Sequence, residues 1–366
     1  MSAAFRFFLL FLPILALALA VVWIEQSRAP APSERLIPEA QAAQAIETPQ
    51  ERALEQTLEE IGASLDGQLG IAVTDVSSGR TFDFNGDDLL PQQSVSKLWV
   101  AMTALAQVDA GELDLQERVT MGRQDLTVFY QPIRNIVRSR GSFTSDYADL
   151  MRRAMAESDN SANDRLLRRV GGPEVVQAWL DSNGLGEIRF GTDERSKQSR
   201  IAGLAWNQAY SYRDEFFKAR DRLPDAARRA AFESYLADPV DGAGAIAMAQ
   251  ALALLARGEL LSESSTALLL DIMREAKSGP RRLKGGVPEG WDFGHKTGTG
   301  QFFDGEQSGY NDVGILTAPD GSAYAIAVLI GRTREPTPAR MDMMQAVTRA
   351  VAAFHEAKKA AQDAAR

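Results

Sequence analysis

The spacing of apolar residues changes along the chain, and each spacing predicts a different element. Apolar residues recur at helical intervals over residues 49–65, which predicts a helix at the start of the folded part. Over residues 68–85 apolar and polar residues alternate around a Ser-Gly turn signal, which is typical of a β-hairpin. From about residue 93 to 275 the spacing is mostly helical.

The last part of the chain returns to strand-like patterns. Three segments there predict strands, the last two of them joined at a Pro-Asp-Gly turn: residues 291–298, 310–321 and 322–331. A helix with an apolar stripe and a basic last turn is predicted over residues 338–362. Strands at both ends with helices between them predict an α+β fold, with one antiparallel sheet built from both ends and a mostly helical lobe. Active sites commonly lie in the groove between two such lobes.

The N-terminal segment has the pattern of an export signal. Arg6 precedes 18 uncharged residues, 7–24, a length that is borderline for spanning a bilayer and long for a cleaved signal. An Ala-Leu-Ala sequence at 18–20 offers a cleavage site, so a cleaved signal peptide and a retained membrane anchor both stay open.

A Pro- and Ala-rich stretch follows this segment and is typical of a tether. The chain is therefore predicted to divide into a signal peptide or anchor, a tether and one folded domain: residues 1–28, 29–49 and 50–360. We expect the folded domain to lie outside the cytoplasmic membrane, in the periplasm.

Charge and residue usage exclude several classes of function. The net charge is −9, the isoelectric point is near 5.0, and no basic run stands out, which argues against nucleic acid as a partner. The chain has no cysteine and only two histidines, His295 and His355, which excludes a thiol nucleophile and a thiolate or His-rich zinc site. We expect neither a metal nor another cofactor.

Ser94 and Lys97 stand at the head of an apolar run that predicts a buried helix. The spacing places Lys97 one turn after Ser94 on the same helix face, within reach of its hydroxyl. Burial lowers the pKa of a lysine, so a neutral amine could accept the serine proton. Taken alone, however, the pair is better explained as a helix-capping serine followed by a lysine whose stem reaches water.

Two further motifs reverse that interpretation. Ser158-Asp159-Asn160 lies between two helical segments, and Lys296-Thr297-Gly298 lies on a predicted strand. Each could be ordinary structure, since S-D-N suits a turn or an N-cap and K-T-G suits a strand end. The order S-x-x-K, S-D-N, K-T-G is nevertheless the signature of class A β-lactamases and penicillin-binding proteins.

With these motifs in place, the chain resembles class A β-lactamases from about Gln50 to the C-terminal helix. The resemblance implies the two-lobed fold of that family and the following roles. Ser94 would attack the lactam carbonyl and form an acyl-enzyme, Lys97 would accept or relay the proton, and Ser158 would pass it to the leaving nitrogen. Asn160 would hold the acylamide side chain of the substrate.

The same resemblance assigns the remaining contacts with the substrate. Lys296 and Thr297 would bind the substrate carboxylate, a role that their charge and hydroxyl also suit independently. The oxyanion would rest on the backbone N–H groups of Ser94 and Thr299. Tyr130 resembles the aromatic residue that lines the entrance of the family's site, and a packing role suits it nearly as well.

The glutamate that would activate water for hydrolysis of the acyl-enzyme is expected at Glu194. Counting without a gap from S-D-N places it there, and Arg189 also falls where the family has an arginine. The usual Glu-Pro and Leu-Asn surroundings are replaced, so that Gln198 stands where an asparagine is expected. Residues 203–240 are longer than the family's loop, and no arginine follows K-T-G closely. Arg332 or Arg334 could substitute for it.

We therefore expect a serine hydrolase that opens β-lactams. The alternative is a penicillin-binding D-Ala-D-Ala carboxypeptidase or transpeptidase, which would use the same three motifs on a peptidoglycan stem peptide without efficient hydrolysis of the lactam adduct. A third hypothesis, from another class of function, is a non-catalytic binding module of the cell envelope that kept the fold. A Ser-His-Asp hydrolase is disfavoured, because His295 points away from its neighbour Lys296 on the strand. We expect a monomer.

Overall fold

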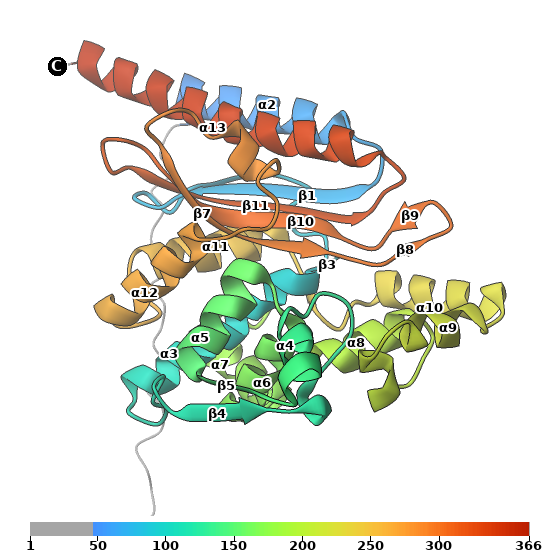
Figure 1. The fold of residues 1–366 in the computed structure, drawn as a ribbon. Coiled ribbons are helices and arrows are strands. Elements are labelled where there is room, and N and C mark those ends of the chain that lie inside the picture. Colours follow the sequence, from blue (N-terminus) through green and yellow to red (C-terminus); the bar gives the residue numbers. More distant parts are fainter. Residues whose placement is uncertain (1–46, 366) are drawn as a thin grey trace, which may run out of the picture. The chain divides into compact units, whose positions relative to one another are not determined.

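The computed structural model describes residues 47–365 (Figure 1). A compact unit begins at Thr48 and includes all three signature motifs. The predicted export segment and nearly all of the predicted tether fall outside the described residues. Within residues 47–365, none of the helices is both long and apolar enough to cross a membrane.

One five-stranded antiparallel sheet combines strands from both ends of the chain (Figure 1). Its order is β2-β1-β11-β10-β7, with these bounds: β1 Gln68–Asp75, β2 Thr81–Phe84, β7 Asp292–Thr299, β10 Tyr310–Thr317 and β11 Ala323–Arg332. The N-terminal strand β1 pairs with the C-terminal strand β11 over its whole length. The predicted α+β class and the predicted sheet from both ends are confirmed.

Helices cover both faces of this sheet. The terminal helices α2 (Pro49–Ala63) and α13 (Thr337–Ala364) lie together on one face, as Figure 1 shows in blue and red. Thr48 begins α2 with a capping box, because its hydroxyl accepts from the Glu51 amide and Glu51 reaches back. On the other face α11 (Ala245–Ala256), whose sequence is almost entirely apolar, packs against β1 and β11.

The helical lobe surrounds α3 (Lys97–Asp109), which is buried from Lys97 to Leu105 as its apolar sequence predicts. Its other elements are α4 Ile133–Arg140, α5 Tyr147–Arg152, the π-helix η3 Arg153–Glu157, α6 Asn160–Val170, α7 Pro173–Ser182, α8 Glu194–Ile201, α12 Glu263–Arg274 and the β4–β5 pair, Arg118–Met121 with Phe143–Asp146. A short pair, β3 (Leu90–Pro91) with β6 (Gly242–Ala243), lies beside β11.

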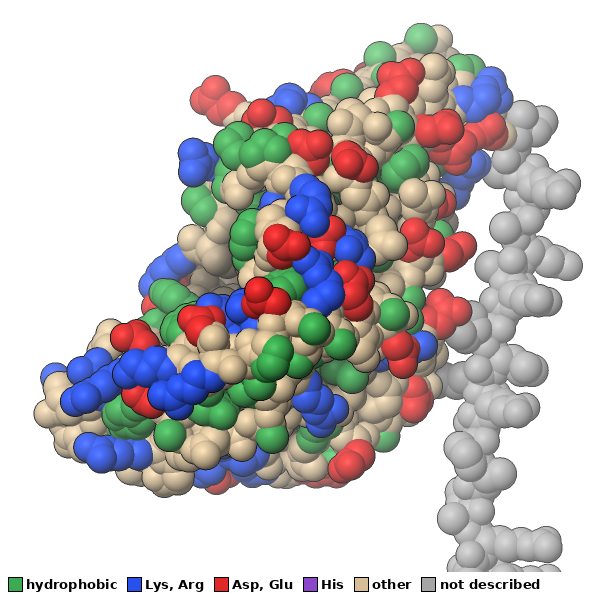
Figure 2. Space-filling view, turned by 90° about the vertical axis from the view of Figure 1, so that its right-hand side faces the viewer, with side chains coloured by type: hydrophobic (Ala, Val, Ile, Leu, Met, Phe, Trp, Pro, Cys, Tyr) green, Lys and Arg blue, Asp and Glu red, His purple; other side chains and the backbone are tan. Residues whose placement is uncertain are grey.

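The long segment 203–240 forms η4 (Gln208–Ser211), α9 (Glu215–Asp221) and α10 (Asp225–Ala237). It is held by ion pairs to the β8–β9 hairpin, Phe302–Phe303 with Glu306–Gln307. Figure 2 views the side of the molecule that carries these elements and shows acidic and basic side chains next to one another there. Arg229 of α10 contacts Glu306 at 3.1 Å.

The same segment also supports the loop that carries Tyr130. The ring of Phe216 in α9 packs edge-on against Phe129 at a centroid distance of 5.0 Å and against Tyr210 at 5.9 Å. Phe129 has a left-handed backbone (φ 60°), a conformation that a bulky residue keeps only when its surroundings enforce it. The aromatic contacts of the segment supply that enforcement.

This arrangement predicts that truncation of two adjacent phenylalanines lowers the free energy of unfolding by different amounts. Phe216→Ala should lower the free energy of unfolding by about 3 kcal/mol, because Phe216 is almost fully buried and its removal leaves a cavity. Phe217→Ala, at a side chain that is 40% exposed, should cost about 1 kcal/mol or less. Urea unfolding followed by circular dichroism measures both values, and a loss of about 1 kcal/mol or less in Phe216→Ala would show that the fold does not depend on the Phe216 contacts.

Candidate active site

Ser94 lies in a single 3₁₀ turn, η1 (Gln93–Ser96), that leads directly into α3. The predicted position at a helix start is therefore confirmed. The turn is strained at Gln93, whose backbone is left-handed (φ 54°). The backbone N–H of Gln93 donates to Asp241 Oδ2 at 2.9 Å, and this hydrogen bond helps to hold the conformation. Strand β7 passes close by, and a methyl group at Gly298 would collide with the Gln92 carbonyl. The glycine of K-T-G is thus required for this close approach.

Lys97 is 1% exposed, and the second motif surrounds its ammonium group. Its Nζ donates to Asn160 Oδ1 at 2.5 Å, to the Ser158 carbonyl at 2.9 Å and to Ser158 Oγ at 3.3 Å. Burial lowers the pKa of Lys97 to about 8, although the charge of Glu194 works in the opposite direction. An amine with that pKa is uncharged often enough near neutral pH to accept a proton.

The Ser158 hydroxyl lies between two lysines. Lys296 on β7 donates to Ser158 Oγ at 2.9 Å, opposite the contact with Lys97. Ser158 follows the π-helix η3 with a left-handed backbone (φ 62°), which turns its side chain toward the sheet. Burial and the charges of Lys97 and Arg282 lower the pKa of Lys296 well below its ordinary value. All three motifs predicted from the sequence therefore converge.

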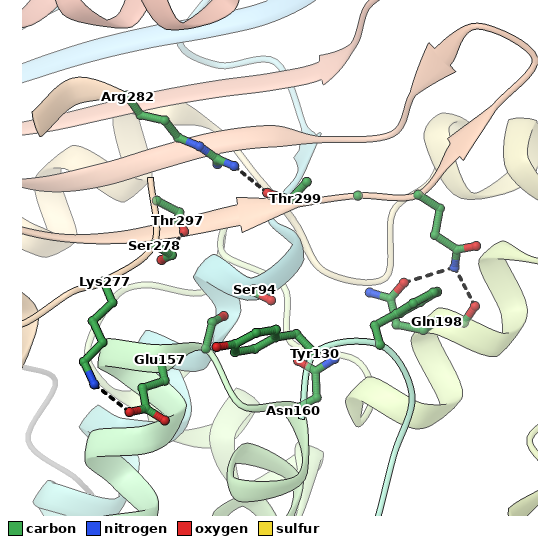
Figure 3. Close-up of a pocket in the computed structure, with 14 residues that line it drawn as sticks. Ser94, Tyr130, Glu157, Asn160, Gln198, Lys277, Ser278, Arg282, Thr297 and Thr299 are labelled. Carbon is green, nitrogen blue, oxygen red and sulfur yellow. Dashed lines mark hydrogen bonds and ion pairs between the residues drawn. The ribbon is translucent and has the colours of Figure 1, made fainter. Parts of the chain in front are cut away.

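A cavity of about 480 Å³ opens at this point, between the helical lobe and β7 (Figure 3). Six of the predicted site residues line it: Ser94, Tyr130, Ser158, Asn160, Thr297 and Thr299. Tyr130 stands at the rim with 60% of its surface exposed. Near it, Lys277 and Glu157 form an ion pair of 2.7 Å across the rim, a contact that the sequence did not indicate. The roles expected for these residues remain predictions.

The end of the cavity near β7 contains a cation that the sequence analysis missed. Arg282 donates to Thr299 Oγ1 at 2.5 Å and to the backbone carbonyls of Gly298 and Asn311. Thr297 Oγ1 lies 2.7 Å from Ser278 Oγ. The only sequence signal for Arg282 was the Arg-Arg pair at 281–282, which lies well before K-T-G. The spacing did not indicate that the chain would bring Arg282 into contact with Thr299 on β7.

The two arginines considered as substitutes lie elsewhere. Arg332 is bonded to Glu233 and Glu306, and Arg334 is bonded to Glu306 and to the Asp304 carbonyl. Both therefore belong to the ion-pair network around the β8–β9 hairpin. Neither is among the residues that line the cavity described above.

Glu194 is the first residue of α8 and is 2% exposed. Its backbone N–H donates to the buried Asp164 at 3.0 Å, which fixes the start of the helix against α6. Its Oε1 pairs with Lys197 Nζ at 3.0 Å and its Oε2 accepts from Gln198 at 3.3 Å. Burial alone would raise the pKa of Glu194, but the charges of Lys197 and Lys97 outweigh burial and lower it to about 2.

Gln198 links Glu194 to the cavity, which it also lines. Its amide nitrogen donates to Gln93 Oε1 at 3.1 Å, and its amide oxygen accepts from Gln301 at 3.0 Å (Figure 3). Gln301 follows β7, so this pair ties α8 to the end of the strand. The contact partners of Gln198 and the position of Gln301 were not apparent from the sequence.

The two histidines of the chain contact residues other than those of the three signature motifs. His295 Nδ1 lies 2.8 Å from Asp312 Oδ1 on β10, and His355 Nδ1 lies 3.1 Å from the Tyr324 hydroxyl. Over residues 47–365, no group of three or more His, Asp or Glu side chains is arranged to hold a metal ion.

Comparisons with known proteins agree with the motifs and the fold. The chain is 26% identical over 279 residues to beta-lactamase VEB-1 of Pseudomonas aeruginosa, covering 76% of this chain and 82% of that protein. It is 29% identical over 283 residues to the extended-spectrum beta-lactamase PER-1 of the same organism, covering 77% and 80%. A solved beta-lactamase from Chitinophaga pinensis superposes with a TM-score of 0.67 at 27% identity, covering 81% of this chain and 97% of that one.

A variant of the reconstructed last common ancestor of the Gram-negative class A beta-lactamases is also similar. It superposes with a TM-score of 0.65 at 29% identity and covers 82% of this chain and 97% of its own. The model of a family described as the beta-lactamase enzyme family matches residues 53–354, which is most of the chain. The resemblance and the two-lobed fold predicted from the sequence are thereby confirmed, and the chain belongs to the beta-lactamase enzyme family.

Proposed function

We propose that this protein hydrolyses β-lactams through an acyl-enzyme on Ser94. The observation that carries the proposal is the convergence on Ser158, whose hydroxyl lies 3.3 Å from Lys97 Nζ and 2.9 Å from Lys296 Nζ. This arrangement connects Lys97, the candidate base three residues after Ser94, with a proton donor for the leaving group. Membership of the beta-lactamase enzyme family and the similarity to PER-1 support the same reaction.

In the acylation step the uncharged amine of Lys97 takes the Ser94 proton while Ser94 Oγ attacks the lactam carbonyl carbon. The ring C–N bond then breaks, and the nitrogen receives a proton from Ser158 Oγ. Lys97 returns a proton to Ser158 along their contact of 3.3 Å. The backbone N–H groups of Ser94 and Thr299 stabilise the negative charge on the carbonyl oxygen.

The substrate carboxylate binds at the β7 end of the cavity. Thr297, Thr299 and Arg282 line this end, and the Arg282 guanidinium donates to Thr299 Oγ1 at 2.5 Å. Lys296, which is fully buried and is not among the lining residues, remains the second group predicted to bind the carboxylate together with Thr297. Asn160 Oδ1 accepts from Lys97, and its Nδ2 donates to the Val128 carbonyl at 3.0 Å, which leaves one amide hydrogen for the acylamide side chain. Tyr130 forms the outer wall of the cavity mouth.

In the hydrolysis step the Glu194 carboxylate takes a proton from water, and the oxygen of that water attacks the ester carbonyl carbon on Ser94. The bond between this carbon and Ser94 Oγ then breaks, and the proton held by Glu194 returns to Ser94 Oγ, which frees the product acid and restores both residues. Glu194 is not itself among the lining residues, but Gln198 lines the cavity and contacts it, and we propose that water reaches the carboxylate beside Gln198. A carboxylate in this position distinguishes a lactamase from the peptidoglycan carboxypeptidase considered above, in which the penicilloyl adduct persists. We further propose that the protein acts in the periplasm as a monomer, held there or released according to the fate of the N-terminal segment.

The proposal is tested first with nitrocefin and intact mass spectrometry on the full chain. We expect turnover with a transient adduct in the native chain and complete loss of both in Ser94→Ala, because no other hydroxyl has the same position. Ser139→Ala, at an exposed position of α4, serves as the control and should match the native chain. A persistent adduct would indicate a penicillin-binding enzyme, and labelling of Ser94→Ala would remove Ser94 as the nucleophile.

A second prediction concerns Glu194. Glu194→Gln should leave the acylation rate within about threefold and lengthen the lifetime of the adduct by at least about 100-fold, which is typical for loss of a general base. Single-turnover mass spectrometry separates the two steps. Glu263→Gln, at the exposed start of α12, is the matched control. Unchanged turnover in Glu194→Gln would place the hydrolytic base elsewhere.

A third prediction concerns pH. Because burial lowers the pKa of Lys97 to about 8, the ammonium form prevails below that pH and cannot accept a proton. The acylation rate constant should therefore rise about tenfold per pH unit below about pH 7.5 and level off above about pH 9. Since the Glu194 charge raises the pKa of Lys97, Glu194→Gln should move this rise to lower pH. An acylation rate that is independent of pH from about 6 to 9 would exclude Lys97 as the base.

A further inference from the structure

Lys197 is a buried cation beside the active site that none of the three signature motifs contains. It lies one turn after Glu194 on α8, and its side chain is 2% exposed. Its Nζ contacts Glu194 Oε1 at 3.0 Å, Asp241 Oδ2 at 3.0 Å, the Gln93 carbonyl at 3.2 Å and Ser96 Oγ at 3.4 Å. One ammonium group thus binds the candidate hydrolytic base and the first and last residues of the turn that carries Ser94.

Asp241 is itself fixed from two sides. Its Oδ2 accepts from the backbone N–H of Gln93 at 2.9 Å, and its Oδ1 accepts from the Tyr235 hydroxyl at 2.8 Å. Tyr235 belongs to α10, so the long segment 203–240 reaches the active site through this contact. Lys197 therefore has a fixed place, and its ammonium group cannot turn away from Glu194 without leaving Asp241 as an unpaired buried charge.

Both carboxylate oxygens of Glu194 already accept from the protein, Oε1 from Lys197 and Oε2 from Gln198. A carboxylate that shares its electron pairs with a cation is a weaker base toward water than an unpaired one. The other titratable groups that act on Glu194 come from four different elements: Lys97 of α3, Asp164 of α6, Tyr235 of α10 and Lys296 of β7.

We propose that Lys197 is a positioning residue that sets the base strength of Glu194 during hydrolysis of the acyl-enzyme. Its charge keeps Glu194 ionised at acidic pH and at the same time slows proton removal from water. This inference rests on the proposed function, because it concerns the second step of that reaction. It also gives the segment 203–240 a part in the chemistry, since Tyr235 and Asp241 hold Lys197 in place.

The test compares variants that change the charge at Lys197 with variants that keep it. Lys197→Met alone would leave Asp241 buried without a cation, so the double variant Lys197→Met, Asp241→Asn removes both charges together. Lys197→Arg keeps the charge. Asp241→Asn alone leaves Lys197 with Glu194 as its single carboxylate partner in the cluster.

The measurement is the deacylation rate constant from single-turnover mass spectrometry with a penicillin, between about pH 4.5 and 8. In the native chain this rate constant should stay nearly constant down to the acid end. In the double variant we expect it to rise at least about threefold at pH 7 and to fall away at acid pH, with an apparent pKa at least about one unit above the native value. In Lys197→Arg the deacylation rate constant should stay nearly constant down to the same acidic pH as in the native chain.

Two results would overturn the inference: an unchanged pH profile in the double variant, or slower deacylation at every pH with no shift, which indicates a merely structural role. If the double variant does not fold, Asp241→Asn decides, because a Lys197 charge shared with Glu194 alone should slow deacylation further. Faster deacylation there would contradict the inference. Absence of any adduct on Ser94 in the native chain would instead be a failure of the proposed function.

Discussion

Two buried ammonium groups meet at one hydroxyl, because Lys97 Nζ and Lys296 Nζ lie 3.3 and 2.9 Å from Ser158 Oγ. A buried lysine is costly unless its charge is paired, hydrogen-bonded or lost. The folded chain uses the last two solutions here, since Asn160 and Ser158 accept hydrogen bonds from Lys97 and burial lowers the pKa values of both lysines. The position of the nucleophile turn, the π-helix before Ser158 and strand β7 all follow from bringing these groups together.

The carboxylates behind the site complete the charge balance. Glu194 and Asp241 are buried with Lys197 between them, 3.0 Å from each. A pair of charges in the interior is tolerated when every member is satisfied, and removing one member leaves the others at a high cost. The long segment 203–240 is part of this balance through Tyr235, and it also holds the left-handed Phe129 next to the cavity mouth.

Most of the fold and the core of the site could be predicted from local pattern. The hairpin, the terminal helices and the buried helix after Ser94 follow from the spacing of apolar residues, which depends only on the geometry of single elements. The family resemblance supplied the remaining arrangement. Arg282 and Gln301 could not be found in this way, because each contacts a residue many positions away and its direction is set by how the chain returns. Lys197 stands only three residues after Glu194, but its second carboxylate partner, Asp241, lies 44 positions away and is brought close by the fold.

The sequence by itself supplied the groups for the expected chemistry: a serine near a lysine, a second serine, and a second lysine on a strand, in an order shared by class A β-lactamases and penicillin-binding proteins. Counting against the family also assigned Glu194 as the carboxylate expected to act in hydrolysis. Only the tertiary structure decided which cation contacts Thr299 and which second carboxylate, Asp241, pairs with Lys197. The physical reason is that a charged side chain is paired by whatever the fold brings within about 3 Å, and that distance is a property of packing rather than of sequence separation.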